Sequence, residues 1–311
     1  MVRNNWHSAH PLTGHVFHEG QLSEPDKTIK SSCGEITMSG ISSFAFELRA
    51  EKISTLVLLG EVHDNPEHHW FRSKILPLIA APVVLEQMSK DQQVAIEKFM
   101  KVSRRTRAVD DFKLSTGWLN SGWQKYPFDV LLQSILELGQ PIYAGDVPRD
   151  AIMKVAKEGE GALPAGERKR LGLDQPLGQK LDNASLAEIE EAHCGAMPKE
   201  AFGGMAYAQR YRDASLADAL LKAADKHGSA ILIAGNGHVR SDRGVRWYIR
   251  QRAPDKKVVS IMLIEVEDGK NDPEAYVPRD PDGKPATDYI IFTPRADRAD
   301  PCEMMKAKTA K

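Results

Sequence analysis

Four short apolar segments of the sequence are each followed closely by ionisable side chains. These side chains are Glu61 and His63, Glu86, Asp146, and His238. Carboxylates and imidazoles carry out general acid–base catalysis and bind metal ions. If the four segments are neighbouring strands of a parallel sheet, their ends meet at the edge where such sheets bind ligands. The sequence therefore predicts one site that gathers these five side chains.

Each of these residues also fits a structural role when it is taken alone. Glu61 would cap the helix that follows it or pair with Arg240, and Asp146 would be a turn residue or the partner of Arg149. A single buried histidine such as His238 is more often a satisfied structural group than a ligand. Because ionisable residues follow all four apolar segments, the functional interpretation is favoured over four separate structural roles.

Two adjacent histidines lie just beyond the first segment. Asn65 and Pro66 form a helix start, with Asn65 as the N-cap and Pro66 at the first helical position. His68 and His69 then fall in the first turn of this helix. Adjacent helical residues point about 100° apart. We therefore expect at most one of them to face the site and the other to lie at the surface.

A second helix, over residues 206–227, carries a polar cluster. Tyr207 and Tyr211 are four residues apart and share a face. One interpretation places one phenol and Arg212 in the crevice, because this helix precedes the segment that ends near His238. The alternative is that the aromatic rings pack on the core.

The pattern of apolar segments predicts the fold class. Strands that are apolar throughout and alternate with helices are typical of a parallel sheet covered on both faces. The fold class expected is α/β, a parallel sheet flanked by helices with a mostly helical insertion. The strands expected are residues 54–59, 82–85, 141–144, 230–234 and 257–266, with a further edge strand at 289–292 and a short one near 35–38.

Changes in composition along the chain suggest five parts. Residues 158–200 are rich in Gly, Glu, Lys and Ala and differ from what precedes them. The expected organisation is an extended lead-in over 1–40, the first part of the core over 41–157, a helical insertion or cap over 158–200, the second part of the core over 201–295, and a flexible tail over 296–311.

Overall composition excludes several classes of protein. The 311 residues carry a net charge of −1, with no basic stripe, which argues against an electrostatic nucleic-acid binder. No apolar run approaches the roughly 20 residues that span a bilayer.

Three cysteines stand far apart and form no C-x-x-C pair. An odd number without close spacing favours reduced thiols over a disulfide framework. The first residues contain no apolar stretch typical of a secretory leader. The chain as given is therefore expected to be cytoplasmic, or periplasmic or membrane-anchored if a leader has been omitted.

The motifs around these residues resemble a known family. Residues 58–69, LLGEVHDNPEHH, are similar to the G-E-x-H-D-x-x-x-H-H signature of the ChaN-like haem-binding family, within the superfamily of Tiki proteins and erythromycin esterases. The other matching motifs, in the expected order, are VLE at 84–86, DVPR at 146–149, the helix with Gln209, Arg212, Asp213, Leu216 and Ala217, and AGNGHV at 234–239.

This resemblance implies a parallel α/β core with a mostly helical additional region. It implies haem binding linked to iron acquisition in exported proteins or lipoproteins, with the Glu61/His63 and His238 loops lining the site. It is also compatible with a homodimer. The sequence departs from the family in lacking a lipobox cysteine and in having Ser215-Leu-Ala217 where the family continues toward Met-Ala.

Three functional hypotheses follow, and the first is a haem-binding protein. It requires an apolar crevice and an axial ligand, for which a phenolate of Tyr207 or Tyr211 is one candidate. The residues expected around haem iron are Glu61, His63, His68, His69, Tyr207, Tyr211, Arg212 and His238. The candidate walls are Trp70, Trp118, Trp123, Phe202 and Met205.

The second hypothesis is a divalent-metal-dependent hydrolase, since four converging ionisable segments exceed what haem requires. The metal ligands would be Glu61, His63, Glu86, Asp146 and His238, and the catalytic residues Glu61, His63 and His238. The third is a non-catalytic protein that binds another anionic small molecule through Arg149, Arg212 and Arg240.

Overall fold

A central sheet organises the molecule. In the computed structural model, which describes residues 10–23, 29–31, 34–36, 55–101, 108–300 and 302–303, eight strands follow the order β2-β1-β10-β9-β5-β8-β6-β7. Six of them run parallel: β5 (Thr55–Leu59), β6 (Val83–Ser89), β7 (Ile142–Asp146), β8 (Ala230–Ile233), β9 (Lys257–Glu265) and β10 (Tyr289–Thr293). This arrangement confirms the predicted parallel sheet.

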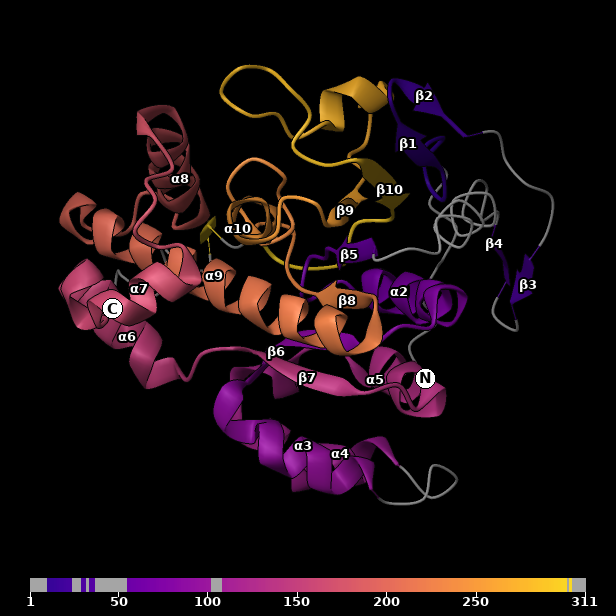
Figure 1. Ribbon diagram of the computed structural model, residues 1–311. Helices are drawn as coiled ribbons and strands as arrows, with labels where there is room; N and C mark the ends of the chain where they lie inside the picture. The colour runs from indigo at the N-terminus through magenta and orange to yellow at the C-terminus, as the bar shows by residue number, and fades with distance from the viewer. Residues whose placement is uncertain are drawn as a thin grey trace.

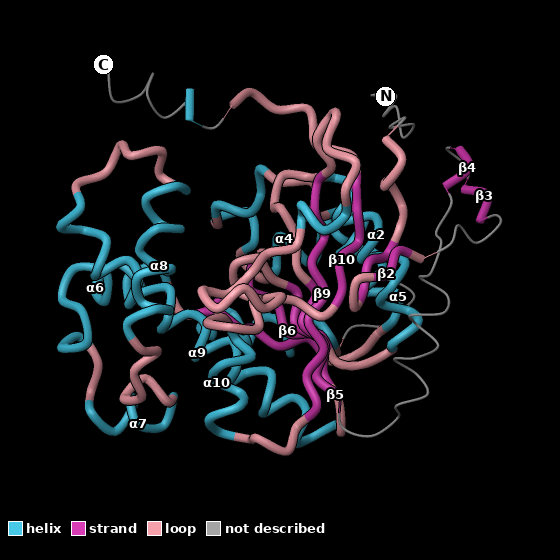
Figure 2. The backbone as a smooth tube through the Cα atoms, turned by 90° about the horizontal axis from the view of Figure 1, so that it is seen from above, coloured by secondary structure: helices cyan, strands magenta, loops and turns pink. Residues whose placement is uncertain are grey.

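Helices cover both faces of the sheet, as the alternation along each strand requires. In β5, Val57 and Leu59 pack with α2 (Pro66–Ile79) and α5 (Asp129–Leu138). Leu56 and Leu58 point the other way, toward α9 (Phe202–His227) and α10 (Val245–Arg252). Figure 2 shows α2 and α5 on one side of the strands and α9 and α10 on the other.

The remaining helices extend this core at two places. Near α2 and α5 lie α3 (Gln93–Met100), α4 (Val109–Ser115) and the 3-10 turns η1 (Lys90–Gln92), η3 (Trp118–Asn120) and η4 (Gly122–Lys125). On the α9 side lie α6 (Arg149–Glu158), η5 (Gly159–Ala162), α7 (Ala165–Leu171), α8 (Gln179–Ala192) and η6 (Lys199–Ala201). Figure 1 shows α6, α7 and α8 grouped at one end of α9.

The N-terminal lead-in takes part in the sheet, which the sequence pattern does not indicate. β1 (Val16–His18) pairs antiparallel with β10, and β2 (Gln21–Leu22) pairs with β1. β10, expected as an edge strand, is therefore an interior one. β3 (Ile29–Ser31) and β4 (Gly34–Ile36) form a separate hairpin, and η7 (Pro273–Tyr276) follows β9.

The prediction of reduced thiols is wrong for two of the three cysteines. Cys194 and Cys302 form a disulfide although they are separated by 108 residues in sequence. The prediction relied on spacing along the chain, but the fold brings the end of α8 beside the C-terminal segment. None of the helices in the described part of the chain combines the length and apolarity that a bilayer crossing requires.

Candidate functional site

Two carboxylates and one arginine form a buried network at the carboxyl edge of the sheet. Arg212, on α9, donates to Asp146 at the end of β7 through Nε (2.9 Å) and Nη2 (2.6 Å). The same Nη2 donates to Glu86 Oε1 at 2.7 Å. Burial opposes the charge on Arg212, but the facing Glu86 and Asp146 carboxylates outweigh it and raise its pKa. Arg212 therefore stays a cation that joins β6 to β7.

His238 is held between two carboxylates. Its Nδ1 lies 2.6 Å from Asp213 Oδ1, and its Nε2 lies 3.2 Å from Glu86 Oε1. Burial alone would lower the pKa of His238, but Glu86 and Asp213 raise it to about 10. The ring is thus an imidazolium with both nitrogens donating. In this state it offers no lone pair to haem iron or to a metal ion.

Asp213 is a site residue that the sequence analysis named only within a matching motif and did not include among the expected site residues. It follows Arg212 directly on α9, and adjacent helical side chains point about 100° apart. Arg212 consequently reaches Glu86 while Asp213 reaches His238. The sequence did offer a signal for Asp213. It lies next to Arg212 on a helix, and the strand after that helix ends near His238.

Glu86 lies within β6 rather than after it. The pairing of β6 with β7 shifts between Leu85 and Ser89, an irregularity that redirects the strand at Glu86. Glu86 Oε2 accepts a hydrogen bond from the Gly235 backbone N–H at 2.7 Å. Burial would raise the pKa of Glu86, but the His238 cation, with His63 and Arg212, holds it well below its usual value. Glu86 is therefore the ionised centre of the network.

Glu61 and His63 form a second pair beside the first network. His63 Nδ1 lies 2.7 Å from Glu61 Oε1. Burial, together with the nearby cations of His238 and Arg212, lowers the pKa of His63, although Glu86 opposes this. A neutral His63 therefore donates through Nδ1. Among the described residues its Nε2 has no hydrogen-bond partner, and its side chain is 32% exposed.

The His63 ring packs directly against Gly235. This close contact requires that residue 235 has no side chain. A Cβ atom placed on Gly235 would lie 2.9 Å from His63 Cε1 and 3.1 Å from Nε2. Contacts this short would displace the imidazole. The glycine after β8 thus lets the loops of β5 and β8 meet.

The other two histidines of the first motif are structural, and neither lies at the surface as predicted. Both are 0% exposed. His68 Nδ1 accepts from the Val62 N–H at 2.8 Å, and its Nε2 bonds Thr293 at 2.7 Å. His69 Nε2 bonds the His63 carbonyl at 2.8 Å, and burial lowers the pKa of His69 to about 4. They hold the loop that carries His63.

Arg72 completes this support from the same helix. It is fully buried, bonds His69 Nδ1 at 2.7 Å, and pairs with Glu61 Oε2. Glu61 is thus saturated by His63 and Arg72, and not by Arg240, which pairs with Asp242. The carboxylates that were candidate metal ligands are occupied by cations. Within the described residues, no group of three or more His, Cys, Asp or Glu side chains is placed to hold a metal ion.

A cleft of about 510 Å³ opens beside these networks. His63, Glu86, Asp146 and Arg212 line its floor. The Trp123 ring meets the His63 ring edge-on, with centroids 4.7 Å apart. The other residues lining the cleft are Gln87, Ser89, Gln92, Asn120, Ser121, Gly122, Lys125, Tyr126, Val147, Arg149, Ile152 and Met153.

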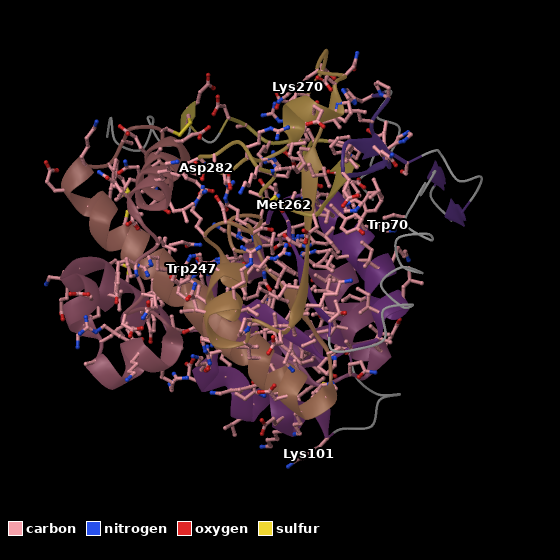
Figure 3. The ribbon with its side chains drawn as sticks, turned by 45° about the horizontal axis from the view of Figure 1, so that its top comes forward. Trp70, Lys101, Trp247, Met262, Lys270 and Asp282 are labelled. Atoms are coloured by element: carbon pink, nitrogen blue, oxygen red, sulfur yellow. A yellow bond between two sulfur atoms is a disulfide. The ribbon has the colours of Figure 1, made fainter. Side chains whose placement is uncertain are left out.

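Of the expected aromatic and sulfur-containing walls, Trp123 alone lines this cleft. Trp118 and Phe202 are buried in packing positions, and Trp70 of α2, labelled in Figure 3, packs against the apolar core. Met205 lines a separate cavity of about 270 Å³ under α8.

Neither tyrosine of α9 lines the cleft. Tyr211 is buried in the apolar cluster between α9, α6 and α7, and Tyr207 packs against the same cluster. The alternative interpretation, packing on the core, describes them. Tyr126, which the sequence analysis did not single out, does line the cleft, with its ring centroid 6.0 Å from that of His63.

Comparisons with known proteins agree with this architecture. The family model described as haem-binding uptake, Tiki superfamily, ChaN, matches residues 49–249. The chain belongs to this family.

A solved structure with the same fold is entitled cofacial heme binding to ChaN of Campylobacter jejuni. It matches 83% of this chain and 92% of its own, with 17% identity and a TM-score of 0.61. A mutant of the erythromycin esterase EreC, solved in its open conformation, matches 84% of this chain and 81% of its own, with 11% identity and a TM-score of 0.42. The comparison with curated protein sequences gives no match.

Proposed function

We propose that this protein binds haem in the cleft beside Glu86, where His63 Nε2 would hold the iron. The observation that carries this proposal is the state of His63. It is neutral, donates through Nδ1 to Glu61, and has no partner at Nε2 among the described residues. Histidines that bind metal centres characteristically donate their second nitrogen to a carboxylate or carbonyl.

The chemistry of the cleft fits a flat, apolar molecule with carboxylate groups. Trp123 and Tyr126 offer aromatic surface, and Lys125 and Arg149 offer cations that suit propionates. Gln87 is buried within this lining, and its Oε1 has no hydrogen-bond partner in the part of the chain that the structure describes. The volume of about 510 Å³ lies within the roughly 300–1,000 Å³ typical of ligand pockets. Bound haem would supply a redox-active iron to this site.

The buried network supports this site without contacting the iron. Glu86 fixes the Gly235 backbone, and Gly235 in turn limits the position of the His63 ring. His238 and Arg212 keep Glu86 ionised and immobile. In this proposal, the network positions His63 and places fixed charges on the floor of the cleft.

A titration of chelator-treated protein with ferric haem, followed in the Soret region, tests the proposal. We expect saturable binding that His63→Ala weakens at least tenfold. His227→Ala, which alters an exposed histidine on α9, is the matched control and should bind normally. Tyr126→Phe tests the phenol in the cleft, and Tyr207→Phe and Tyr211→Phe test the two phenols expected from the sequence. Normal binding by His63→Ala would contradict the assignment of the ligand.

The same pair also suits a second function, hydrolysis with His63 as general base. A water molecule would give a proton to Nε2 while its oxygen attacks an ester carbonyl carbon, and Glu61 would stabilise the resulting imidazolium. The tetrahedral intermediate would then break its C–O bond to the alcohol, which would take the proton from Nε2 and leave His63 neutral. Because Arg72 and Arg212 already occupy Glu61 and Glu86, the arrangement favours a version without a divalent ion. Chelator-treated protein should then cleave activated esters, and His63→Asn should abolish turnover. Equal turnover by wild type and His63→Asn would reject this function.

A further inference from the structure

The chain leaves β10 as a C-terminal arm, residues 294–300 with Cys302, that crosses the carboxyl edge of the sheet. Arg298 donates to both oxygens of Asp64 at 2.7 and 2.8 Å. It also donates to Glu265, at 2.6 and 2.7 Å. Asn65 Nδ2 donates to the Pro294 carbonyl at 2.9 Å. The arm is therefore attached to the two residues that directly follow His63.

A disulfide fixes the far end of this arm. Cys302 is bonded to Cys194, just beyond the end of α8. Figure 2 shows the arm running from the strands toward α8, and Figure 3 draws the disulfide. Both cysteines are half-buried, so a thiol reagent can reach them. No residue of α8 is fully buried, so this helix has little burial of its own to keep it in place.

Residues of the arm and of the loop that carries His63 line one cavity together. A cavity of about 630 Å³ is lined by Val62 from the loop and by Arg295 and Arg298 from the arm. Val62 precedes His63, which lines the haem cleft instead. The loop of residues 61–65 is thus shared by two cavities, and the arm supports it on the side away from the cleft.

We propose that the Cys194–Cys302 disulfide is a redox latch, which keeps the arm on the loop of residues 61–65 and thereby sets the position of His63. A dithiol reductant opens the latch by thiolate attack on one sulfur. The S–S bond breaks, the two cysteines gain two electrons and two protons to become thiols, and the reductant becomes a disulfide. The arm is then held by the Arg298 pairs and by two hydrogen bonds, from Asn65 to the Pro294 carbonyl and from the Ala296 N–H to Glu265. Partly exposed ion pairs of this kind hold weakly. The effect on haem rests on the proposed function, whereas the effect on the loop does not.

Hydrogen exchange without haem tests the latch on the full chain, in a Cys33→Ser background that removes the third thiol. We expect amides of residues 61–65 and 295–300 to exchange at least tenfold faster after dithiothreitol treatment, and likewise in Cys302→Ser. Reduction of the otherwise intact chain gives this readout even if Cys302→Ser folds poorly. Exchange rates for residues 61–65 that agree within twofold in the oxidised and reduced protein would overturn the proposal.

A haemin titration of oxidised and of reduced, alkylated protein tests the consequence for the ligand. The dissociation constant should rise at least threefold on reduction. Arg298→Ala, with the disulfide intact, should raise it in the same direction, because it cuts the link between the arm and Asp64. An unchanged dissociation constant in both would overturn the control of His63 by the arm. If oxidised protein binds no haemin, the haem proposal fails, and the exchange experiment still decides the latch.

Discussion

His63 and His238 end adjacent strands of one sheet, yet their surroundings give them opposite chemistry. His238 is buried between Glu86 and Asp213, which raise its pKa to about 10. His63 is hydrogen-bonded to one carboxylate, Glu61, whose second oxygen is paired with Arg72. Burial lowers the pKa of His63 although the nearby Glu86 opposes this. One ring is a fixed cation, and the other is a neutral base open to a cleft. The number of uncompensated carboxylates around an imidazole, rather than its place at the end of a strand, decides which function it can have.

The largest expected effect comes from removing the charge at the centre of the His238 network. Glu86→Gln keeps an acceptor for the Gly235 N–H but leaves His238 and Arg212 as buried cations with less compensation. Breaking one partner of a buried ion pair typically costs about 3–5 kcal/mol. We expect the free energy of unfolding in urea to fall by that order. Glu188 pairs with Arg243, and its side chain is about half exposed. Glu188→Gln should therefore change the free energy of unfolding by less than about 1 kcal/mol.

The pH dependence of stability should have opposite signs for the two histidine environments. The folded pKa of His238, about 10, lies above its unfolded value, so its stabilisation is complete below pH 6.5 and is lost as the pH rises toward 10. The folded pKa of His69, about 4, is depressed, so its contribution is present above pH 6.5 and is lost as the pH falls toward 4. We expect urea unfolding to show a maximum between these two limbs.

One other group contributes to the alkaline limb and must be separated from His238. Burial raises the pKa of Glu67 from 4.5 to about 8, so its contribution is complete below pH 4.5 and is lost as the pH rises toward 8. Glu67→Gln removes this contribution and should leave an alkaline decline centred above pH 8. If that variant has no remaining decline up to pH 10, the assignment of a protonated His238 is wrong.

The contact between Gly235 and His63 gives an intermediate effect that links the two regions. Gly235→Ala would place a methyl group 2.9 Å from the His63 ring, and overpacking of this kind typically costs about 1–3 kcal/mol. Haemin affinity should fall about tenfold because the ring must move. Gly237→Ala is the matched control, since its nearest contact would be an ordinary 3.9 Å. Equal haemin affinity in the two variants would show that the position of His63 does not matter for binding.

The sequence predicted which side chains meet at the carboxyl edge of the sheet better than it predicted their charge states. Unbroken apolar strands indicated the parallel sheet, and this placed Glu61, Glu86, Asp146 and His238 at one edge. Their partners depended on side-chain directions that spacing does not fix. Arg72 looked like an ordinary helical arginine, yet it neutralises Glu61.

Long-range pairing was equally hidden from the sequence. The disulfide of Cys194 with Cys302 and the pairing of β1 with β10 both join segments far apart in the chain. No local pattern of residues encodes such contacts, because they follow from the way the whole chain folds. Tyr126 was missed for a related reason: it follows a 3-10 turn without clear periodicity, and the cleft wall that it forms appears once that turn is packed beside His63.

Substitution of His63 should have the smallest effect on the free energy of unfolding and the largest effect on haem binding. His63 is partly exposed, its Nε2 makes no hydrogen bond among the described residues, and the loop around it is held by His68 and His69. His63→Ala should therefore lower the free energy of unfolding by no more than about 1 kcal/mol. His69→Ala, which removes a buried ring and a bond to the His63 carbonyl, should cost several times more. A ligand-binding residue is expected to behave in this way, because its bonding capacity is reserved for the bound molecule. A large loss of stability in His63→Ala, comparable with that in His69→Ala, would instead assign His63 to the structural set that supports the loop.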